Sequence, residues 1–389
     1  MIYQIPRLGD EDRHVLALID DQRNLLKHHL AQAPHRWLGF LRRNTFARAL
    51  QGSNSIEGYN ATLDEAAAIV DDARPETVAE ETVKALIGYR TAMTYILRLH
   101  NDPYFTLNTQ FIRSLHFMML SHDLTKLPGQ WRQGPIYVVN EPSKEVVYEG
   151  PDYALVPALA DELMAQLNDG RALDLLVKGA MAHLNLTMIH PFKDGNGRMA
   201  RALQTLVIAQ DGILSPEFSS IEEWLGRNTQ DYYAILAAVG QGKWNPHHDA
   251  LPWVRFCLKA HYQQAATLIR RNNEIGQAWQ RAQSLVTQHR LPQRMELALV
   301  DAIFGFRVRS SRYKTEHDIS EFVASRDLKK LCDLGFLEPV GDKRGRYYVA
   351  AEPLKTIRAE ITRNRPKIPD PYDIIATGGQ MSLPGVDQS

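Results

Sequence analysis

A short stretch of the chain, residues 190–201, reads His-Pro-Phe-Lys-Asp-Gly-Asn-Gly-Arg-Met-Ala-Arg and places several reactive and anion-binding groups close together. Gly195 and Gly197 can adopt backbone angles that are closed to residues with a side chain, so consecutive N–H groups can point into one concavity. At the start of a helix such a concavity favours phosphate, because the unpaired amide groups and the helix dipole both attract an anion. The stretch therefore predicts a phosphate-binding turn.

The charged side chains of the same stretch suit this site. Arg198 and Arg201 share one face of the helix that should follow the turn, and each guanidinium can hold a phosphate through two hydrogen bonds. Asp194 is a hard carboxylate that suits a Mg²⁺ ion bound to phosphate oxygens. His190, with an ordinary pKa of about 6.5, can take a proton from an attacking hydroxyl at neutral pH. Separately, a His-Pro pair is usually a helix end and Gly-Asn-Gly a turn, but together these residues predict phosphoryl or nucleotidyl transfer.

Residues 190–201 also match, without departure, the signature of the Fic (filamentation induced by cAMP) domain family, which is His-Pro-Phe-x-(Asp/Glu)-Gly-Asn-Gly-Arg-x-x-Arg. The chain thus resembles that family, and the resemblance implies a protein adenylyltransferase that moves AMP from ATP to a Ser, Thr or Tyr hydroxyl of a target protein. It implies His190 as the catalytic base and Asp194 as the Mg²⁺ ligand. The motif residues that would bind ATP are Asp194, Gly195, Asn196, Gly197, Arg198 and Arg201. A kinase-like branch of the family alters the glycine turn, and the intact turn here favours AMP transfer.

A second pattern lies near the N-terminus, where Ser53 and Glu57 are four residues apart and Gly58 follows. The two side chains would share a helical face, and Gly58 is placed to end the helix. Alone, this pattern is more often a plain helix end. The resemblance gives it weight, because the family's autoinhibitory motif is (Ser/Thr)-x-x-x-Glu-(Gly/Asn). It implies that Glu57 pairs with Arg201, or with Arg198, in the place of the ATP γ-phosphate, and that the inhibitory helix belongs to the N-terminal region (class II).

Two β-rich runs predict a hairpin over residues 134–150. The first run is Ile136, Tyr137, Val138 and Val139, and the second is Val146 to Tyr148. An ordinary surface hairpin is the alternative, but the resemblance implies a flap that registers the target by strand pairing.

The helix predicted from Trp224 to Val239 carries Tyr232 and Tyr233. Paired tyrosines on a helix more often serve packing, whereas the resemblance implies that they line the adenosine pocket, with Tyr232 as the first candidate. Some family members have an asparagine seven residues after the second tyrosine, and this chain has Gly240 there.

The composition bounds the class of protein. The chain has 389 residues, 45 Lys+Arg against 45 Asp+Glu, and two cysteines far apart in sequence. No global charge draws it to nucleic acid or membrane, and the cysteines suggest reduced thiols. Nothing resembles a signal peptide, and no apolar run reaches about 18 residues. We therefore expect a cytoplasmic protein that does not bind membranes.

The predicted fold is mainly α, a Fic-type helical bundle with a β-hairpin flap and a small C-terminal winged helix-turn-helix domain. The expected domains are an N-terminal helical region with the inhibitory helix (1–100), the catalytic core (101–288), the winged-helix-like domain (289–352) and a C-terminal tail (353–389) that is loosely ordered from Pro366. Residues 307–346 hold ten Lys/Arg against seven Asp/Glu, which favours protein contacts or a homodimer over DNA. Two alternatives stay open: removal of AMP by the same site, and a DNA-binding regulator that acts through the winged helix.

Overall fold

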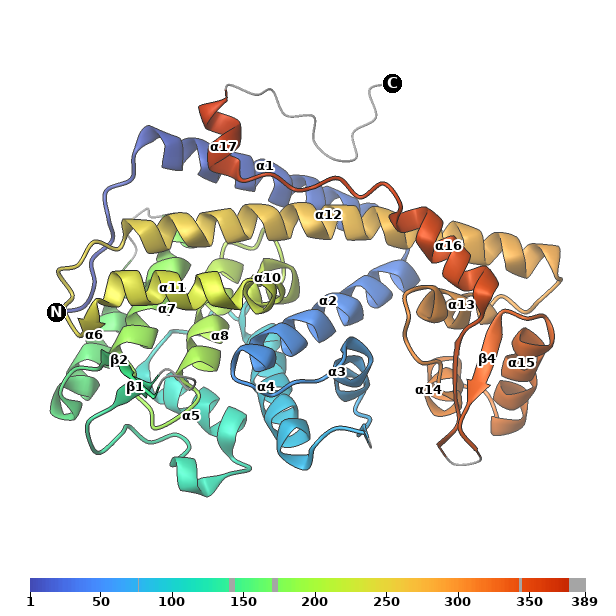
Figure 1. Ribbon diagram of the computed structural model, residues 1–389, viewed down its shortest axis with the longest axis horizontal. Helices are drawn as coiled ribbons and strands as arrows, with labels where there is room; N and C mark the ends of the chain where they lie inside the picture. The colour runs from blue at the N-terminus through green and yellow to red at the C-terminus, as the bar shows by residue number, and fades with distance from the viewer. Residues whose placement is uncertain (76, 140–143, 170–173, 343–344, 378–389) are drawn as a thin grey trace. The chain divides into compact units, whose positions relative to one another are not determined.

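The computed structural model describes residues 1–75, 77–139, 144–169, 174–342 and 345–377, and this part of the chain is mainly α-helical with two small sheets (Figure 1). The chain divides into two compact units. Of the described residues, the first unit holds Met1–Ala31, Arg42–Thr267 and 369–377, and the second holds Gln32–Leu41 and Leu268–Ile368. Every candidate site residue lies in the first unit.

The N-terminal helices follow local sequence signals closely. They are α1 (Asp10–Gln32), α2 (His35–Ile56), α3 (Leu63–Val70), α4 (Glu80–Leu99) and α5 (Thr109–Leu120). Thr62 and Glu65 form a capping box at the start of α3, because each side chain accepts a hydrogen bond from the other residue's backbone N–H. α4 and α5 cross at Gly88, where a Cβ atom would lie 2.2 Å from the carbonyl oxygen of Met119.

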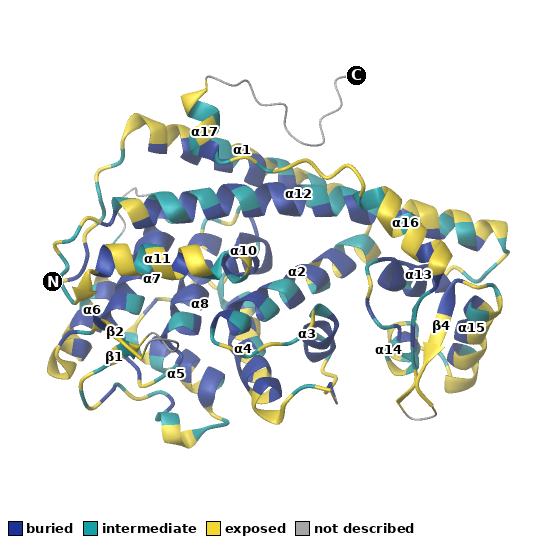
Figure 2. Cartoon of the chain, in the orientation of Figure 1, coloured by how far each residue is buried: buried dark blue, intermediate teal, exposed yellow. Residues whose placement is uncertain are grey.

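The centre of the first unit is the pair α7 (Leu175–Ile189) and α8 (Asn196–Ala209), which lie side by side and are buried on nearly all faces (Figure 2). A helix that is apolar all round, as α7 is, requires such a place in the core. The helices approach closely at Gly179, where a Cβ atom would lie 2.7 Å from Ile208. α6 (Val156–Asn168) packs on α7, and two short 3₁₀ helices, η1 (Leu124–Lys126) and η2 (Tyr153–Leu155), lie in the connections.

The remaining helices of this unit are α9 (Pro216–Ser219), α10 (Glu222–Arg227), α11 (Thr229–Gly240), the start of α12 (Leu251–Gln288) and α17 (Pro371–Ala376). The single helix predicted from Trp224 to Val239 is wrong, because the chain breaks at Asn228. The Asn228 amide donates a hydrogen bond of 2.8 Å to the carbonyl of Trp224, and such local bonds compete with helix continuation.

The predicted hairpin is present as β1 (Tyr137–Val139) and β2 (Val146–Glu149), which pair antiparallel with Tyr137 opposite Glu149. Residues 140–143 of the expected flap lie outside the described residues. A third strand, β3 (Gly242–Lys243), pairs parallel with β2, so the order is β1-β2-β3 and β1 is an edge. Sequence patterns missed β3 because two residues carry no periodicity.

The second unit contains α13 (Met295–Ile303), α14 (Ser310–Glu316), α15 (Glu321–Asp333), β4 (Leu337–Val340), β5 (Tyr347–Ala350) and α16 (Glu352–Thr362). β4 and β5 pair antiparallel. The helix α15 begins after Ser320, whose side chain accepts a hydrogen bond from the N–H of Val323. The expected loose tail is also wrong for residues 371–376, because α17 forms there and the Tyr372 hydroxyl lies 3.1 Å from Asp12.

Among the helices that the structure describes, none combines the length and apolar character needed to cross a lipid bilayer.

Candidate active site

α7 ends at His190, which has the left-handed backbone angles φ 50° and ψ 58°. Its N–H donates to the carbonyl of Leu186 at 3.0 Å, so the turn closes the helix. A residue with a side chain adopts this conformation at a cost of about 1–2 kcal/mol, and such strain is common at functional sites.

The imidazole of His190 is prepared to act as a base. Its Nδ1 lies 3.1 Å from the carbonyl oxygen of Thr187. Because a carbonyl only accepts, Nδ1 carries the proton and Nε2 presents a lone pair. Burial lowers the pKa of His190 below its usual value of 6.5, and the bond to Thr187 opposes this only partly. The ring is therefore neutral at pH 7.

The turn after His190 follows the predicted glycine pattern at Gly195, whereas Gly197 lies within α8 and has no positive φ. Gly195, with φ 76°, precedes α8, and a Cβ atom there would lie 2.8 Å from Leu120. Asn196 accepts from the N–H of Phe192 and donates to its carbonyl, both at 2.9 Å. The Asn196 side chain thus clamps the turn, and only its backbone amide, at the start of α8, remains for a phosphate.

Arg198 is a buried guanidinium that lacks a hydrogen bond. Its side chain is fully buried, and within the described part of the chain none of its three nitrogens has a hydrogen-bond partner. The Tyr59 ring lies 5.2 Å from its Cζ, and Asp194 Oδ2 is 3.9 Å from Nη2. Burying a charge with so little compensation is costly. The arrangement is therefore suited to an anion that supplies the missing acceptors.

Arg201 differs because α2 supplies its acceptors. Its Nε donates to Ser53 Oγ at 2.8 Å, and its Nη2 donates to the Ser53 carbonyl at 2.9 Å and to Glu57 Oε1 at 2.6 Å. Burial alone would lower the pKa of the Arg201 guanidinium, but the Glu57 carboxylate outweighs it and raises the pKa. Of the two expected partners of Glu57, the structure selects Arg201.

The Glu57 carboxylate also lies over the start of α8. A Cβ atom on Gly197 would be 2.4 Å from Glu57 Oε1. Gly58, with φ 84°, ends α2 as predicted and directs the chain away. An acidic group thus occupies the place at the helix N-terminus where a phosphate is favoured.

Asp194 has a partner that the sequence did not indicate. Lys126 Nζ lies 2.6 Å from Asp194 Oδ2 and donates to the Tyr59 hydroxyl at 3.4 Å. Burial raises the pKa of the Asp194 carboxyl, but Lys126 and then Arg198 outweigh it and hold the pKa below its usual value. Asp194 is therefore ionised at neutral pH.

His116 is a second residue that sequence reasoning missed. Its ring stacks on Phe192 with centroids 3.7 Å apart. The Gly129 N–H donates to Nδ1 at 2.8 Å, so Nε2 carries the proton and donates to the Asp194 carbonyl at 2.9 Å. Burial lowers the pKa of His116 to about 4. This neutral ring fixes the backbone beside the metal-binding candidate.

The two tyrosines differ in access. Tyr232 is 1% exposed, and its hydroxyl lies 2.9 Å from Nε2 of the buried His183. Tyr233 is 49% exposed, and its hydroxyl donates to the Ile56 carbonyl at 2.8 Å, next to Glu57. A nucleotide could therefore reach Tyr233 directly, whereas Tyr232 is buried in the core.

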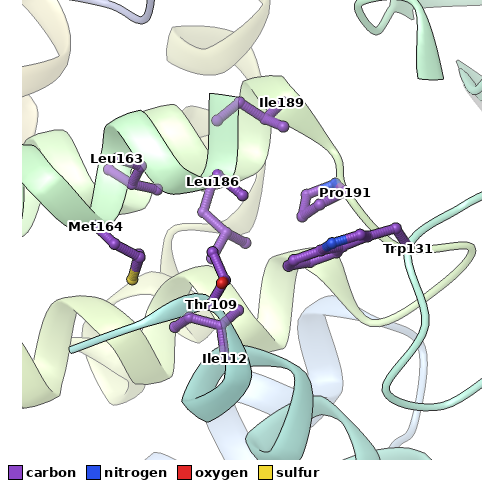
Figure 3. A pocket seen from close by; sticks show the side chains of 9 residues that line it. Thr109, Ile112, Trp131, Leu163, Met164, Leu186, Ile189 and Pro191 are labelled. Carbon is purple, nitrogen blue, oxygen red and sulfur yellow. The ribbon is translucent and has the colours of Figure 1, made fainter. Parts of the chain in front are cut away.

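The small cavity behind the turn does not serve a ligand (Figure 3). It has a volume of about 10 Å³, and its lining is apolar, with Trp131, Ile189 and Pro191 on the side of the motif. A nucleotide needs hundreds of Å³, and a water needs polar partners. The cavity is a packing defect.

Asp194 suits a Mg²⁺ ion that takes most of its ligands from bound phosphates and water. The described residues include no cluster of three or more His, Cys, Asp or Glu that could hold a metal. Mg²⁺ commonly binds through one or two carboxylates together with substrate phosphates and water. One ionised carboxylate beside a phosphate-binding turn meets that requirement once Lys126 moves away.

Comparison with known proteins agrees with this geometry. Residues 106–208 match the Fic/DOC family. The chain is 26% identical over 261 residues to the protein adenylyltransferase fic-1 of Caenorhabditis briggsae, covering 65% of this chain and 46% of that protein. It is 25% identical over 269 residues to the protein adenylyltransferase Fic of Nematostella vectensis, covering 66% and 56%. The chain spans about half the length of these relatives.

Solved structures show the same fold. A Fic family protein from Desulfovibrio desulfuricans G20 superposes with a TM-score of 0.57 at 21% identity, over 90% of this chain and 99% of that chain. Fic-1 from C. elegans gives a TM-score of 0.54 at 24% identity, over 66% and 72%. Residues 106–208 thus match the Fic/DOC family around a complete motif, and the chain is similar in sequence to Fic protein adenylyltransferases.

Proposed function

We propose that this protein is an adenylyltransferase that moves AMP from ATP to a hydroxyl of a target protein. The observation that carries the proposal is the pairing of a neutral His190, with Nε2 free to accept, and a buried Arg198 that lacks hydrogen-bond acceptors among the described residues. One group can remove a proton, and the other can bind a polyphosphate.

In this reaction His190 Nε2 takes the proton of a Ser, Thr or Tyr hydroxyl. The hydroxyl oxygen bonds to the α-phosphorus, and the bond from that phosphorus to the bridging oxygen breaks. Pyrophosphate leaves with the electron pair, while Arg198 and Arg201 stabilise its charge. Asp194 would hold Mg²⁺, which neutralises phosphate charge when bound.

We propose that Glu57 keeps resting activity low. It neutralises Arg201 at 2.6 Å and lies against Gly197, so a triphosphate would meet a carboxylate in place of a free guanidinium. Its side chain is 22% exposed, so it can leave without disturbing the core.

The edge strand β1 suits target docking. Tyr137 and Val139 are 49% and 37% exposed, and the outer edge of β1 pairs with no other strand among the described residues. An unpaired edge offers backbone groups to an extended segment. Such pairing would place the acceptor hydroxyl with little demand on the target's sequence.

The test incubates wild type, Glu57→Gly and Glu57→Gly/His190→Ala with ATP and cell lysate, and reads intact mass together with label from α-³²P-ATP. We expect label on protein with Glu57→Gly, much less with wild type, and none above background with the double variant. Release of AMP from premodified protein that requires Glu57 would instead support the alternative, removal of AMP, in which Glu57 positions water.

We propose that α13 to α15 with β4 and β5 form a winged-helix-like domain for protein contacts or a homodimer. α15, the helix that would enter a DNA groove, has two of its exposed cations beside acids: Lys329 Nζ is 2.8 Å from Asp333, and Arg326 is 3.6 Å from Asp327. This offsets the charge that phosphate binding needs. Salt-sensitive DNA binding that survives His190→Ala would favour the regulator alternative.

A further inference from the structure

Arg132 is a buried arginine whose contacts join the two parts of the site that must meet during reaction. Its side chain is 5% exposed and lies in the connection that leads to β1. Nε donates to the carbonyl of His190 at 2.9 Å, and Nη1 donates to the carbonyl of Gly134 at 2.7 Å. Nη2 donates to the carbonyl of Pro151.

These three carbonyls come from three separate places. Gly134 precedes β1, Pro151 follows β2, and His190 carries the base. The Arg132 N–H also donates to the carbonyl of Pro191 at 2.9 Å. One residue therefore holds both ends of the β1–β2 hairpin, here called the flap, against the loop that carries the imidazole.

The geometry requires a guanidinium rather than a simple positive charge. The rigid, planar fork of arginine points its donors in fixed directions, whereas the lysine ammonium is a compact group on a flexible stem. A lysine at this position would keep the charge but could not reach all three carbonyls in one plane. The carbonyls left over would be buried without a donor.

We propose that Arg132 is a positioning residue that fixes the flap relative to His190 Nε2, and so sets the distance between a docked acceptor hydroxyl and the base. The inference rests on the proposed AMP transfer and adds the part that registers the target. The side-chain donors of Arg132 go to the carbonyls of Gly134, Pro151 and His190 and not to Asp194, Arg198 or Arg201, so nucleotide binding does not depend on it.

The test compares Arg132→Lys with Arg113→Lys, both in the Glu57→Gly background. Arg113 is the matched control, because its Nε donates to the carbonyl of Gly129 at 2.8 Å. Gly129 lies in the same connection before β1 as Arg132, but this bond holds neither the flap nor His190. The rate of label transfer from α-³²P-ATP to lysate proteins gives kcat and the KM for ATP. Amide hydrogen exchange without nucleotide reports on residues 137–139 and 146–149.

We expect Arg132→Lys to lower kcat by about 10- to 100-fold, as a misplacement near 1 Å does, with the KM for ATP within about 2-fold of Glu57→Gly. Flap amides should exchange faster than in Arg113→Lys. If kcat and KM change together, or if the two variants exchange alike, Arg132 supports the fold in general and the proposal is overturned.

Two further results keep the outcome clear. If Arg132→Lys does not fold, Gly150→Ala tests the same contacts from the flap side, because its Cβ would lie 2.6 Å from Ile136 and 3.4 Å from Arg132 Nη2. We expect this variant to give the same fall in kcat at constant KM. An unchanged kcat would overturn the proposal. If Glu57→Gly transfers no label at all, the proposed function fails, and the exchange comparison still decides whether Arg132 fixes the flap.

Discussion

The segment from His190 to Arg201 is held from two sides, and the two supports differ in kind. On one side His116 and Arg132 are buried and donate to main-chain carbonyls of Asp194 and His190. On the other side Glu57, 22% exposed, reaches Arg201 through its side chain. A phosphate can replace a partly exposed carboxylate, but no ligand can replace a buried bond to the main chain. The first support therefore builds the site, and we propose that the second controls it.

The largest effect should come from replacing Glu57 and then His190. Glu57→Gly leaves the buried support intact, so label transfer should rise. Adding His190→Ala should lower that rate by about 10²- to 10⁴-fold, the usual contribution of a general base. Initial rates with α-³²P-ATP measure both steps. A double variant as fast as Glu57→Gly would remove His190 from the mechanism.

The buried support should matter most for stability. His116→Ala removes a ring stacked on Phe192 and leaves the Asp194 carbonyl and the Gly129 N–H without their bonds. We expect a loss of about 3 kcal/mol in the free energy of unfolding, measured by urea denaturation. His122→Ala, a half-buried histidine nearby, is the control. Equal losses in the two variants would show that His116 has no special part in holding the loop.

A second carboxyl near Arg201 sharpens the contrast with Glu57. Glu222 is 1% exposed and accepts from the Tyr89 hydroxyl, and burial raises its pKa from 4.5 to about 7. Between these pH values the folded state holds a proton that the unfolded state releases. The contribution of Glu222 to the free energy of unfolding is therefore fully present below pH 4.5. It falls by up to about 3 kcal/mol as the pH rises to about 7.

Glu222→Gln should flatten this pH dependence, because its amide does not titrate. Thermal unfolding of both proteins from pH 4.5 to 8 measures the difference. Parallel curves for the two proteins would show that Glu222 is ionised in the fold.

The smallest effect should come from replacing Ser53, which helps Glu57 to hold Arg201. Ser53→Ala removes one hydrogen bond to Arg201 Nε, worth about 1 kcal/mol, and should raise resting transfer by about 5-fold. Ser55→Ala is the matched control, because the Ser55 hydroxyl donates locally to the Gly52 carbonyl at 2.9 Å. Equal rates in the two variants would contradict a role for Ser53 in holding Arg201.

The sequence predicted what local patterns determine. The helix end at Gly58 and the glycine turn at Gly195 depend on neighbouring residues, and both were predicted. The resemblance added the pairing of Glu57 with Arg201, residues far apart in the chain. The break at Asn228 was missed, because a side-chain bond overrode an otherwise helical pattern.

The supports of the site could not be predicted. Lys126, His116 and Arg132 lie in different elements before the motif, and each acts on a backbone or side chain that only tertiary packing brings near. Nothing in their spacing distinguishes them from ordinary surface or core residues. Side chains that do chemistry form a contiguous motif, whereas side chains that position them are collected by the fold.

The most direct measurement compares two labels on one reaction. Glu57→Gly is incubated with lysate and either α-³²P-ATP or γ-³²P-ATP, and protein-bound label is counted. Transfer of AMP predicts protein labelled by the α-phosphate and not by the γ-phosphate, and dependent on His190. Label from the γ-phosphate, or no label from either nucleotide, would contradict a site in which His190 directs a hydroxyl to the α-phosphorus.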